Sequence, residues 1–93
     1  MEIRFYIDPE TNEPHIYKHN VLENEVQEIL ERPSEDRPGS DGARVAIGRT
    51  SNGRYLRVIY ALDVESGSIF IVTAYELQGK PLTAYQRRRR RNK

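Results

Sequence analysis

Three β-like runs joined by short turn sequences occupy residues 43–75, and this arrangement restricts the possible folds more than any other feature. From Ala43 the apolar residues recur with a period of two, which is typical of half-buried strands. Ser51–Arg54 separates the first two runs, and its Asn-Gly pair favours the positive φ angles of a two-residue type I′ turn. Residues 63–67 then lead into Ser68–Tyr75, a connection too short for a parallel crossover. The sequence therefore predicts three antiparallel strands in a meander.

The segment before this meander predicts a strand, a helix and a loop. Ile3–Ile7 is rich in β-branched and aromatic residues and ends at an Asp-Pro turn signal. Asn20 and Glu23 have the spacing of a capping box, so we expect a helix to begin there and to end before Arg-Pro. Residues 34–42 have the composition of a loop. The apolar stripe of the predicted helix consists of Leu22, Val26, Ile29 and Leu30.

The end of the chain predicts a further helix, because Pro81 suits a first helical position and Leu82 and Tyr85 share one helical face. The element order is then β-α(α)-β-β-β-α, an α+β fold with a mainly antiparallel four-stranded sheet and helices packed on it. A chain of 93 residues is the size of one domain. We expect that domain over residues 1–86, followed by a basic arginine-rich tail at residues 87–93.

Composition excludes several classes of protein. The chain has no cysteine, so a disulfide scaffold, a zinc ribbon and a thiol nucleophile are all excluded. No apolar run approaches the roughly 18 residues that span a bilayer, and the first residues do not resemble a signal peptide. We expect a cytoplasmic protein without a membrane partner. There is no glycine-rich phosphate loop, no nucleophile elbow and no paired-carboxylate motif that stands out, which argues against an ATPase, a protease or a glycosidase.

Charge is distributed unevenly along the chain. Residues 1–46 carry five basic and eleven acidic side chains, a net charge of −6, whereas residues 47–93 carry ten basic and three acidic ones, a net charge of +7. Such polarity indicates a basic surface for nucleic acid or for an acidic partner. The alternative is an ordinary solvated surface with a frayed tail, since the five arginines Arg87–Arg91 account for much of the difference.

The predicted two-residue turn places Gly48 opposite Arg57 and Ile47 opposite Val58, and opposed residues share a face. The outer face then combines guanidinium groups with tyrosine above small residues, a surface that suits RNA phosphates and bases. Alternatively, these arginines cover a helix or pair with the acids of residues 23–36. The expected core face carries Val45, Ile47, Leu56, Val58 and Tyr60, with Arg49 at its end, and the outer face carries Arg44, Ala46, Gly48, Tyr55, Arg57 and Ile59.

Two spacings suggest chemistry before the first helix. His15, His19 and Glu23 follow at intervals of four, as metal ligands on a helix would, but Pro14 and the expected cap at Asn20 interrupt that helix. We therefore predict no metal site. Lys18 beside His19 is a better candidate, because a lysine stabilises phosphorane charge and a histidine moves protons. The alternative is a packed His19 and a solvated Lys18.

Four segments together resemble the BrnT toxins of the RelE/ParE-like superfamily. They are Phe5–Glu10, Lys18–Val21, Arg44–Gly48 and Leu56–Tyr60. The likeness follows the order and spacing of the family over most of the chain, and the chain is equally similar to a related family of unknown function. The resemblance implies a RelE-like fold and a metal-independent endoribonuclease, in which the RNA 2′-hydroxyl attacks the neighbouring phosphate. It implies no cofactor and a cognate antitoxin as protein partner.

The residues that match this expectation divide into two groups. Lys18 and Arg57 would stabilise phosphate charge, and His19 or Tyr75 would transfer protons. The BrnT pattern has Ser-Ala-Arg at the end of its last strand, whereas this chain has Thr-Ala-Tyr ending at Tyr75, which removes a fixed charge worth about 10²–10³ in rate. A non-catalytic RNA- or protein-binding module is therefore the alternative function. The expected RNA-binding residues are Arg44, Arg49, Tyr55, Tyr85, Arg87 and Arg88.

Overall fold

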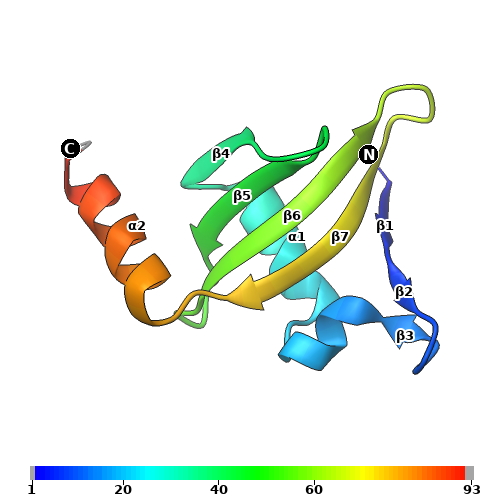
Figure 1. Cartoon of the computed structure of the whole chain (residues 1–93), viewed down its shortest axis with the longest axis horizontal. Helices are drawn as coiled ribbons and strands as arrows, with labels where there is room; N and C mark the ends of the chain where they lie inside the picture. The colour runs from blue at the N-terminus through cyan, green and yellow to red at the C-terminus, as the bar shows by residue number, and fades with distance from the viewer. Residues whose placement is uncertain (1, 92–93) are drawn as a thin grey trace.

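A mixed sheet of five strands forms the centre of the computed structural model, which describes residues 2–91 (Figure 1). The strands are β1 (Ile3–Phe5), β4 (Glu35–Pro38), β5 (Arg44–Arg49), β6 (Tyr55–Asp63) and β7 (Ser68–Glu76). Their order across the sheet is β1-β7-β6-β5-β4; β1 is parallel to β7, and the other neighbours are antiparallel. The α+β class is confirmed, but the predicted count of four strands is wrong.

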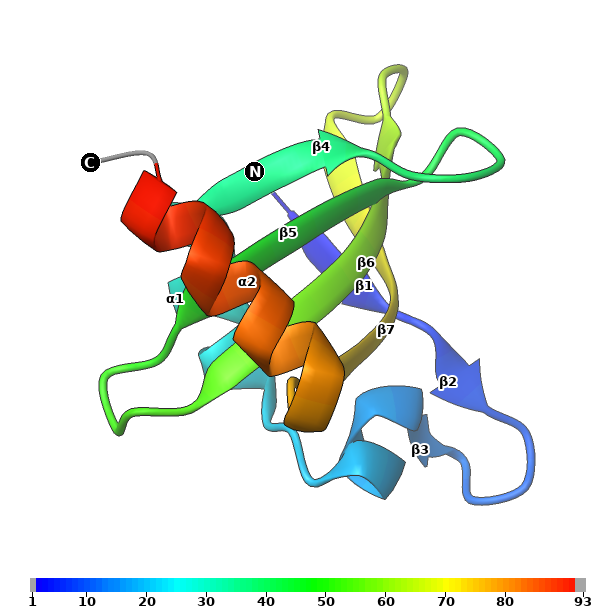
Figure 2. The same ribbon diagram turned by 60° about the vertical axis from the view of Figure 1, so that its left-hand side comes forward.

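Helices cover both faces of this sheet. They are the 3₁₀ helix η1 (His15–His19), α1 (Glu23–Glu31) and α2 (Gly79–Arg91), and a small two-stranded sheet of β2 (Ile7–Asp8) and β3 (Glu13–Pro14) precedes them. Figure 2 shows α2 in front of β5 and β6 with α1 behind them. The arginine run expected to form a tail is thus the last part of α2 as far as Arg91. Among residues 2–91, no helix has both the length and the apolar character needed to cross a membrane.

The first helix begins later than the sequence predicts. Asn20 has a left-handed φ of 58° and ends η1, so the expected capping box of Asn20 and Glu23 does not form. Instead, the carboxylate of Glu25 accepts a hydrogen bond of 3.0 Å from the amide of Leu22, just before α1. Leu22 is 56% exposed rather than part of the core, and Val21 is fully buried in its place. Residues 20–22 therefore connect η1 to α1.

The larger core lies between α1, η1 and the sheet. Burial of apolar area there provides most of the free energy that holds α1 against β5 and β6. Within it, Val26 and Ile29 of the predicted stripe are fully buried. The buried residues of this core are Ile16, Val21, Val26, Ile29, Ala46, Leu56, Val58, Tyr60, Ile71 and Ala74.

The β5–β6 hairpin has a register one residue away from the predicted one. Ile47, not Gly48, lies opposite Arg57, and Arg49 lies opposite Tyr55. A shift of one residue moves every side chain of a strand to the other face. The faces predicted for β6 are therefore correct, and those predicted for β5 are reversed.

The turn itself explains this shift. The loop contains three residues, Ser51–Gly53, because the Gly53 amide bonds to the Thr50 carbonyl at 3.0 Å and the Thr50 amide to the Arg54 carbonyl at 2.8 Å. Of the Asn-Gly pair, only Gly53 has a positive φ, 93°. Three-residue hairpin loops commonly place glycine in this conformation, whereas the predicted type I′ turn requires two positive φ angles.

The fifth strand, β4, lies where the sequence predicts a loop. Glu35–Pro38 pairs with β5 along the edge of the sheet, with Glu35 opposite Ile47 and Pro38 opposite Arg44. Charged residues and proline are typical of edge strands, whose outer side needs no hydrogen-bond partner. Composition alone therefore does not distinguish this edge strand from a loop.

The second, smaller core lies under α2. It contains Ile47 of β5, Leu77 from the segment after β7, and Tyr85 of α2, and Leu82 packs beside them. Leu82 and Tyr85 thus share a buried face, as predicted. The register of β6 with β7 places Tyr75 directly opposite Arg57 on the same side of the sheet as α2. This side is the one that carries most of the candidate functional residues.

Candidate nucleic-acid interface

Arg57 and Tyr75 form the centre of the first candidate site. An Nη1 hydrogen of Arg57 is donated to the Tyr75 hydroxyl at 3.2 Å, and the guanidinium carbon lies 5.8 Å from the centre of the Tyr75 ring. Within residues 2–91 Arg57 forms no ion pair, and its Nε is buried without a hydrogen-bond partner. Its positive charge therefore lies half-buried beside a tyrosine and is not neutralised by a carboxylate of the described chain.

His19 extends this site from η1. Its ring centre lies 6.0 Å from that of Tyr75 and 5.2 Å from that of His15, edge-on in both cases. The His19 side chain is exposed. The structure thus brings together three of the four predicted catalytic residues, although they come from η1, β6 and β7.

Lys18 is the fourth, and it points elsewhere. Its Nζ lies 2.7 Å from Oδ2 of the buried Asp8 and 3.4 Å from Oε2 of Glu10. Lys18 lowers the pKa of Asp8 to about 2, assisted by a hydrogen bond from the Glu10 amide. His15 Nδ1 also lies 3.2 Å from the same carboxylate. Lys18 is therefore part of an ion-pair cluster around Asp8 rather than of the Arg57 site, and the predicted grouping of Lys18 with Arg57 does not form.

A cleft between the sheet and α2 forms the second candidate site. Its volume is about 520 Å³. Arg49 lies over the Tyr55 ring, with its guanidinium carbon 5.9 Å from the ring centre, and the rings of Tyr55 and Tyr85 are 5.7 Å apart. Three of the residues predicted to bind RNA therefore meet here. The cleft is also lined by Ser34, Gln86, Arg89 and Arg90.

The arginines of α2 differ in what they contact. Arg88 donates two hydrogen bonds to Glu35, of 2.7 and 3.0 Å, and this contact lowers the pKa of Glu35. Arg87 lies beside Lys80 in a separate hollow along the helix. Neither lines the cleft, whereas Arg89 and Arg90 do. Neither Arg89 nor Arg90 is among the residues predicted from the sequence, although Arg89 follows Tyr85 by four residues, the spacing that places two side chains on one helical face.

Arg44 lies on the opposite side of the sheet from Arg57, so its predicted place beside Arg57 is wrong. The one-residue register shift turns it toward the α1-covered face. There its Nε lies 3.0 Å from Asp36, which also accepts a hydrogen bond of 2.6 Å from Tyr60. Burial, together with Asp36, raises the pKa of the Tyr60 hydroxyl. Arg44 has a partner within the fold and acts as a structural residue.

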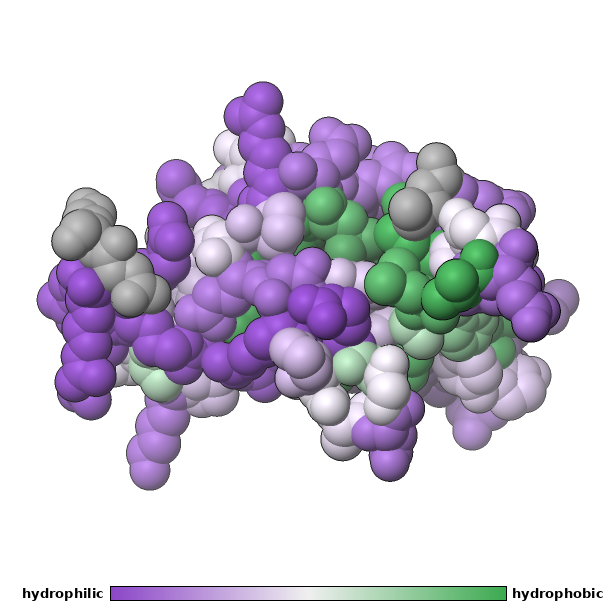
Figure 3. All heavy atoms as spheres, turned by 90° about the horizontal axis from the view of Figure 1, so that it is seen from above, coloured by the Kyte–Doolittle hydropathy of each residue, from purple (hydrophilic) through white to green (hydrophobic). Residues whose placement is uncertain are grey.

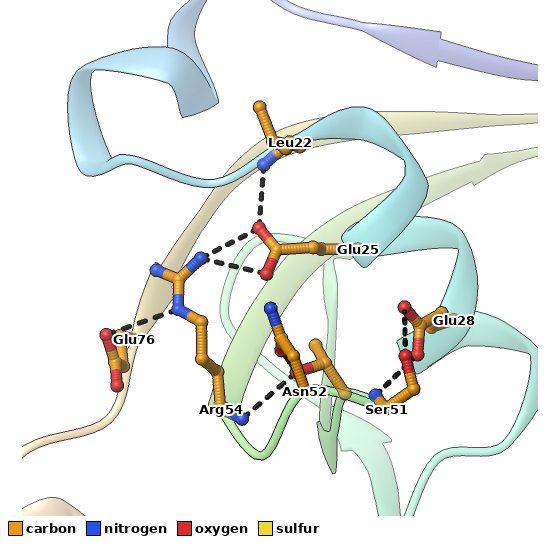
Figure 4. Close-up of polar contacts among 8 residues, drawn as sticks. Leu22, Glu25, Glu28, Ser51, Asn52, Arg54 and Glu76 are labelled. Atoms are coloured by element: carbon orange, nitrogen blue, oxygen red, sulfur yellow. Dashed lines mark hydrogen bonds and ion pairs between the residues drawn. The ribbon is translucent and has the colours of Figure 1, made fainter.

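Arg54 is the centre of a second neutralised cluster, which the sequence analysis did not anticipate (Figure 4). Its Nη1 contacts both oxygens of the buried Glu25 at 2.8 and 2.9 Å, and its Nε lies 3.4 Å from Glu76. Glu28 accepts two further hydrogen bonds from Ser51 in the hairpin loop. These contacts join α1 to the β5–β6 turn.

The surface also differs in hydropathy from one end of the molecule to the other. Seen from above, hydrophilic residues cover the end of the molecule formed by α2, and hydrophobic residues gather toward the other end (Figure 3). Leu62 and Val64, at the β6–β7 turn, are 52% and 90% exposed. On the face seen from above, the α2 end is therefore mainly hydrophilic.

Comparisons of the chain with protein-family models, with curated proteins and with solved structures gave no match.

Proposed function

We propose that this protein is a metal-independent endoribonuclease of the BrnT-like kind, a cytoplasmic toxin with RelE-like topology that a cognate antitoxin neutralises. The observation that carries the proposal is the half-buried Arg57 guanidinium, which has no carboxylate partner in residues 2–91. It lies beside Tyr75, whose ring in turn lies beside that of His19. Partial burial of a positive charge without an anionic partner costs desolvation free energy, which a bound anion would offset.

The chemistry assigned to these residues is an internal transesterification of RNA. The 2′-oxygen forms a bond to the adjacent phosphorus, its proton is removed, and the bond from phosphorus to the 5′-oxygen breaks as that oxygen takes up a proton. The products are a 2′,3′-cyclic phosphate and a 5′-hydroxyl. Arg57 stabilises the negative charge that develops on the phosphate oxygens. His19 is the first candidate for proton transfer, and the Tyr75 hydroxyl is the second.

The test combines cells and purified protein. Expression of the wild-type protein from a tightly repressed promoter is expected to arrest growth, and Arg57→Ala is expected to relieve the arrest. Purified protein is expected to cleave a single-stranded RNA in the presence of EDTA and to leave 2′,3′-cyclic phosphate ends. Full growth with intact transcripts, or cleavage that Arg57→Ala leaves unchanged, would contradict the proposal.

A non-catalytic RNA-binding module is the second candidate function. It is favoured by Lys18, which is engaged with Asp8 and Glu10, and by tyrosine at position 75 in place of the arginine of the BrnT pattern. In that case long incubations would give no RNA cleavage, while RNA binding would still weaken when Arg57 is replaced. The same cleavage assay therefore separates the two candidates.

A further inference from the structure

We infer that the cleft between α2 and the sheet holds one nucleotide of a single-stranded RNA, with its base against Tyr55 and Arg49 and its phosphates on Arg89 and Arg90. The inference rests on the proposed function for the identity of the polymer, and it assigns the substrate a second point of contact besides Arg57. The volume of about 520 Å³ falls within the range of roughly 300–1,000 Å³ found for pockets that hold small molecules.

The base-binding wall comes from the sheet. Tyr55 is half-buried, and the ring of Tyr85, which is only 2% exposed, lies against it at an angle of 59°. Tyr85 therefore fixes the Tyr55 ring rather than contacting a ligand itself. Arg49 is exposed and already lies over the Tyr55 ring. A flat aromatic ring and a planar guanidinium are the groups on which unstacked bases stack.

The phosphate-binding wall comes from the helix. Arg89 and Arg90 are exposed and line the cleft, and among residues 2–91 no carboxylate side chain lines it. Arg88, which precedes them in α2, contacts Glu35, and this ion pair neutralises that carboxylate and joins the helix to β4. Within the described part of the chain, three cations thus face one cleft: Arg49 from β5, and Arg89 and Arg90 from α2.

The combination favours a nucleotide over an acidic protein segment. Carboxylates on a peptide would use the arginines but have no need for an aromatic wall, whereas a nucleotide uses both. Gln86 and Ser34 also lie in the cleft, where an amide and a hydroxyl can hydrogen-bond to a base edge. An acidic peptide is therefore the competing outcome of the test.

The test compares two double variants of equal charge on one helix. Arg89→Gln with Arg90→Gln removes the cleft cations, and Arg87→Gln with Arg91→Gln removes two cations that do not line it. The probe is a short single-stranded oligoribonucleotide that contains 2-aminopurine, with affinity measured by fluorescence anisotropy. We expect the cleft pair to weaken binding about tenfold or more and the control pair to weaken it a few-fold at most. Equal losses in the two pairs would overturn the inference.

Stacking is measured in the same experiment from the fluorescence of 2-aminopurine, which a stacked aromatic ring quenches. Tyr55→Leu is expected to abolish the quenching and to weaken binding by about five- to a hundredfold, whereas Tyr55→Phe retains both. Thermal melting of each variant reports whether it folds, and the arginine pairs test the inference independently of Tyr55. Unchanged quenching in a folded Tyr55→Leu would contradict it, and so would a polyglutamate peptide that shows the arginine dependence in place of the RNA.

The outcomes also separate this inference from the proposed function. If the oligoribonucleotide binds with the expected difference between the arginine pairs but is never cleaved, the cleft stands and the nuclease proposal fails. If cleavage depends on Arg57 while both arginine pairs bind equally, the nuclease proposal stands and the cleft fails.

Discussion

On the α1-covered side of the sheet Arg44 and Arg54 each contact a carboxylate, whereas on the α2 side Arg49 and Arg57 form no ion pair within residues 2–91. Both pairs of arginines come from the same hairpin and differ chiefly in the face that they join. The acidic N-terminal half supplies Asp36 and Glu25 on the first face, and β7 adds Glu76, whereas the second face is covered by the arginine-rich α2. Arg44 and Arg54 are therefore neutralised within the fold, whereas Arg49 and Arg57 remain available to a ligand.

The largest expected difference between the two faces is in catalysis. In the proposed mechanism Arg57 stabilises the phosphorane, so Arg57→Gln is expected to lower the rate of RNA cleavage by about 10²–10³. Arg44→Gln makes the same chemical change on the other face and is expected to change the rate less than about threefold. Single-turnover cleavage assays of both folded variants measure this ratio. Similar losses in the two variants would remove the distinction between the faces.

For stability the order is reversed. Arg54→Gln leaves the buried Glu25 carboxylate without its cation and is expected to lower the free energy of unfolding by roughly 2–3 kcal/mol. The matched change Arg49→Gln is expected to cost less than about 0.5 kcal/mol, because Arg49 is exposed. Urea unfolding of both variants gives the two values. A greater loss for Arg49→Gln would show that the α2 face depends on its arginines for folding.

The smallest effect concerns Lys18, a cation that also forms ion pairs within the fold. The pKa of Asp8 is lowered from the usual 3.8 to about 2, chiefly by Lys18. Between these two values the unfolded state therefore binds more protons than the folded state. The stabilisation is complete above about pH 5 and is lost as the pH falls from about 4 to about 2. Urea unfolding between pH 2 and 6 is expected to show a shallower loss of stability for Asp8→Asn than for the wild type. Identical pH profiles would exclude this role for Asp8.

The sequence predicted the parts of the fold that depend on periodicity. The inward face of β6, the buried Val26 and Ile29, and the shared face of Leu82 and Tyr85 all follow from apolar residues at a period of two or 3.6. Patterns of this kind persist because burial of apolar area dominates the free energy of folding. They are local properties of the sequence.

What the sequence did not predict depends on turns and on distant partners. An Asn-Gly pair fits both a two-residue and a three-residue loop, and the choice exchanges Arg44 for Arg49 on the face that carries Arg57. Edge strand β4 is held by backbone hydrogen bonds to β5, which place few demands on side chains. The engagement of Arg88 with Glu35 joins residues 53 positions apart, so no local pattern distinguishes Arg88 from Arg89.

The most direct test is the salt dependence of RNA binding, which counts the cations that contact phosphate. Two double variants remove equal charge: Arg49→Gln with Arg57→Gln from the α2 face, and Arg44→Gln with Arg54→Gln from the α1-covered face, where both cations contact carboxylates. The first pair is expected to reduce the slope of log K against log salt by about 1.4 for a single-stranded RNA, and the second to leave it nearly unchanged. Equal reductions in both pairs would contradict the claim that the α2 face is the one that binds RNA.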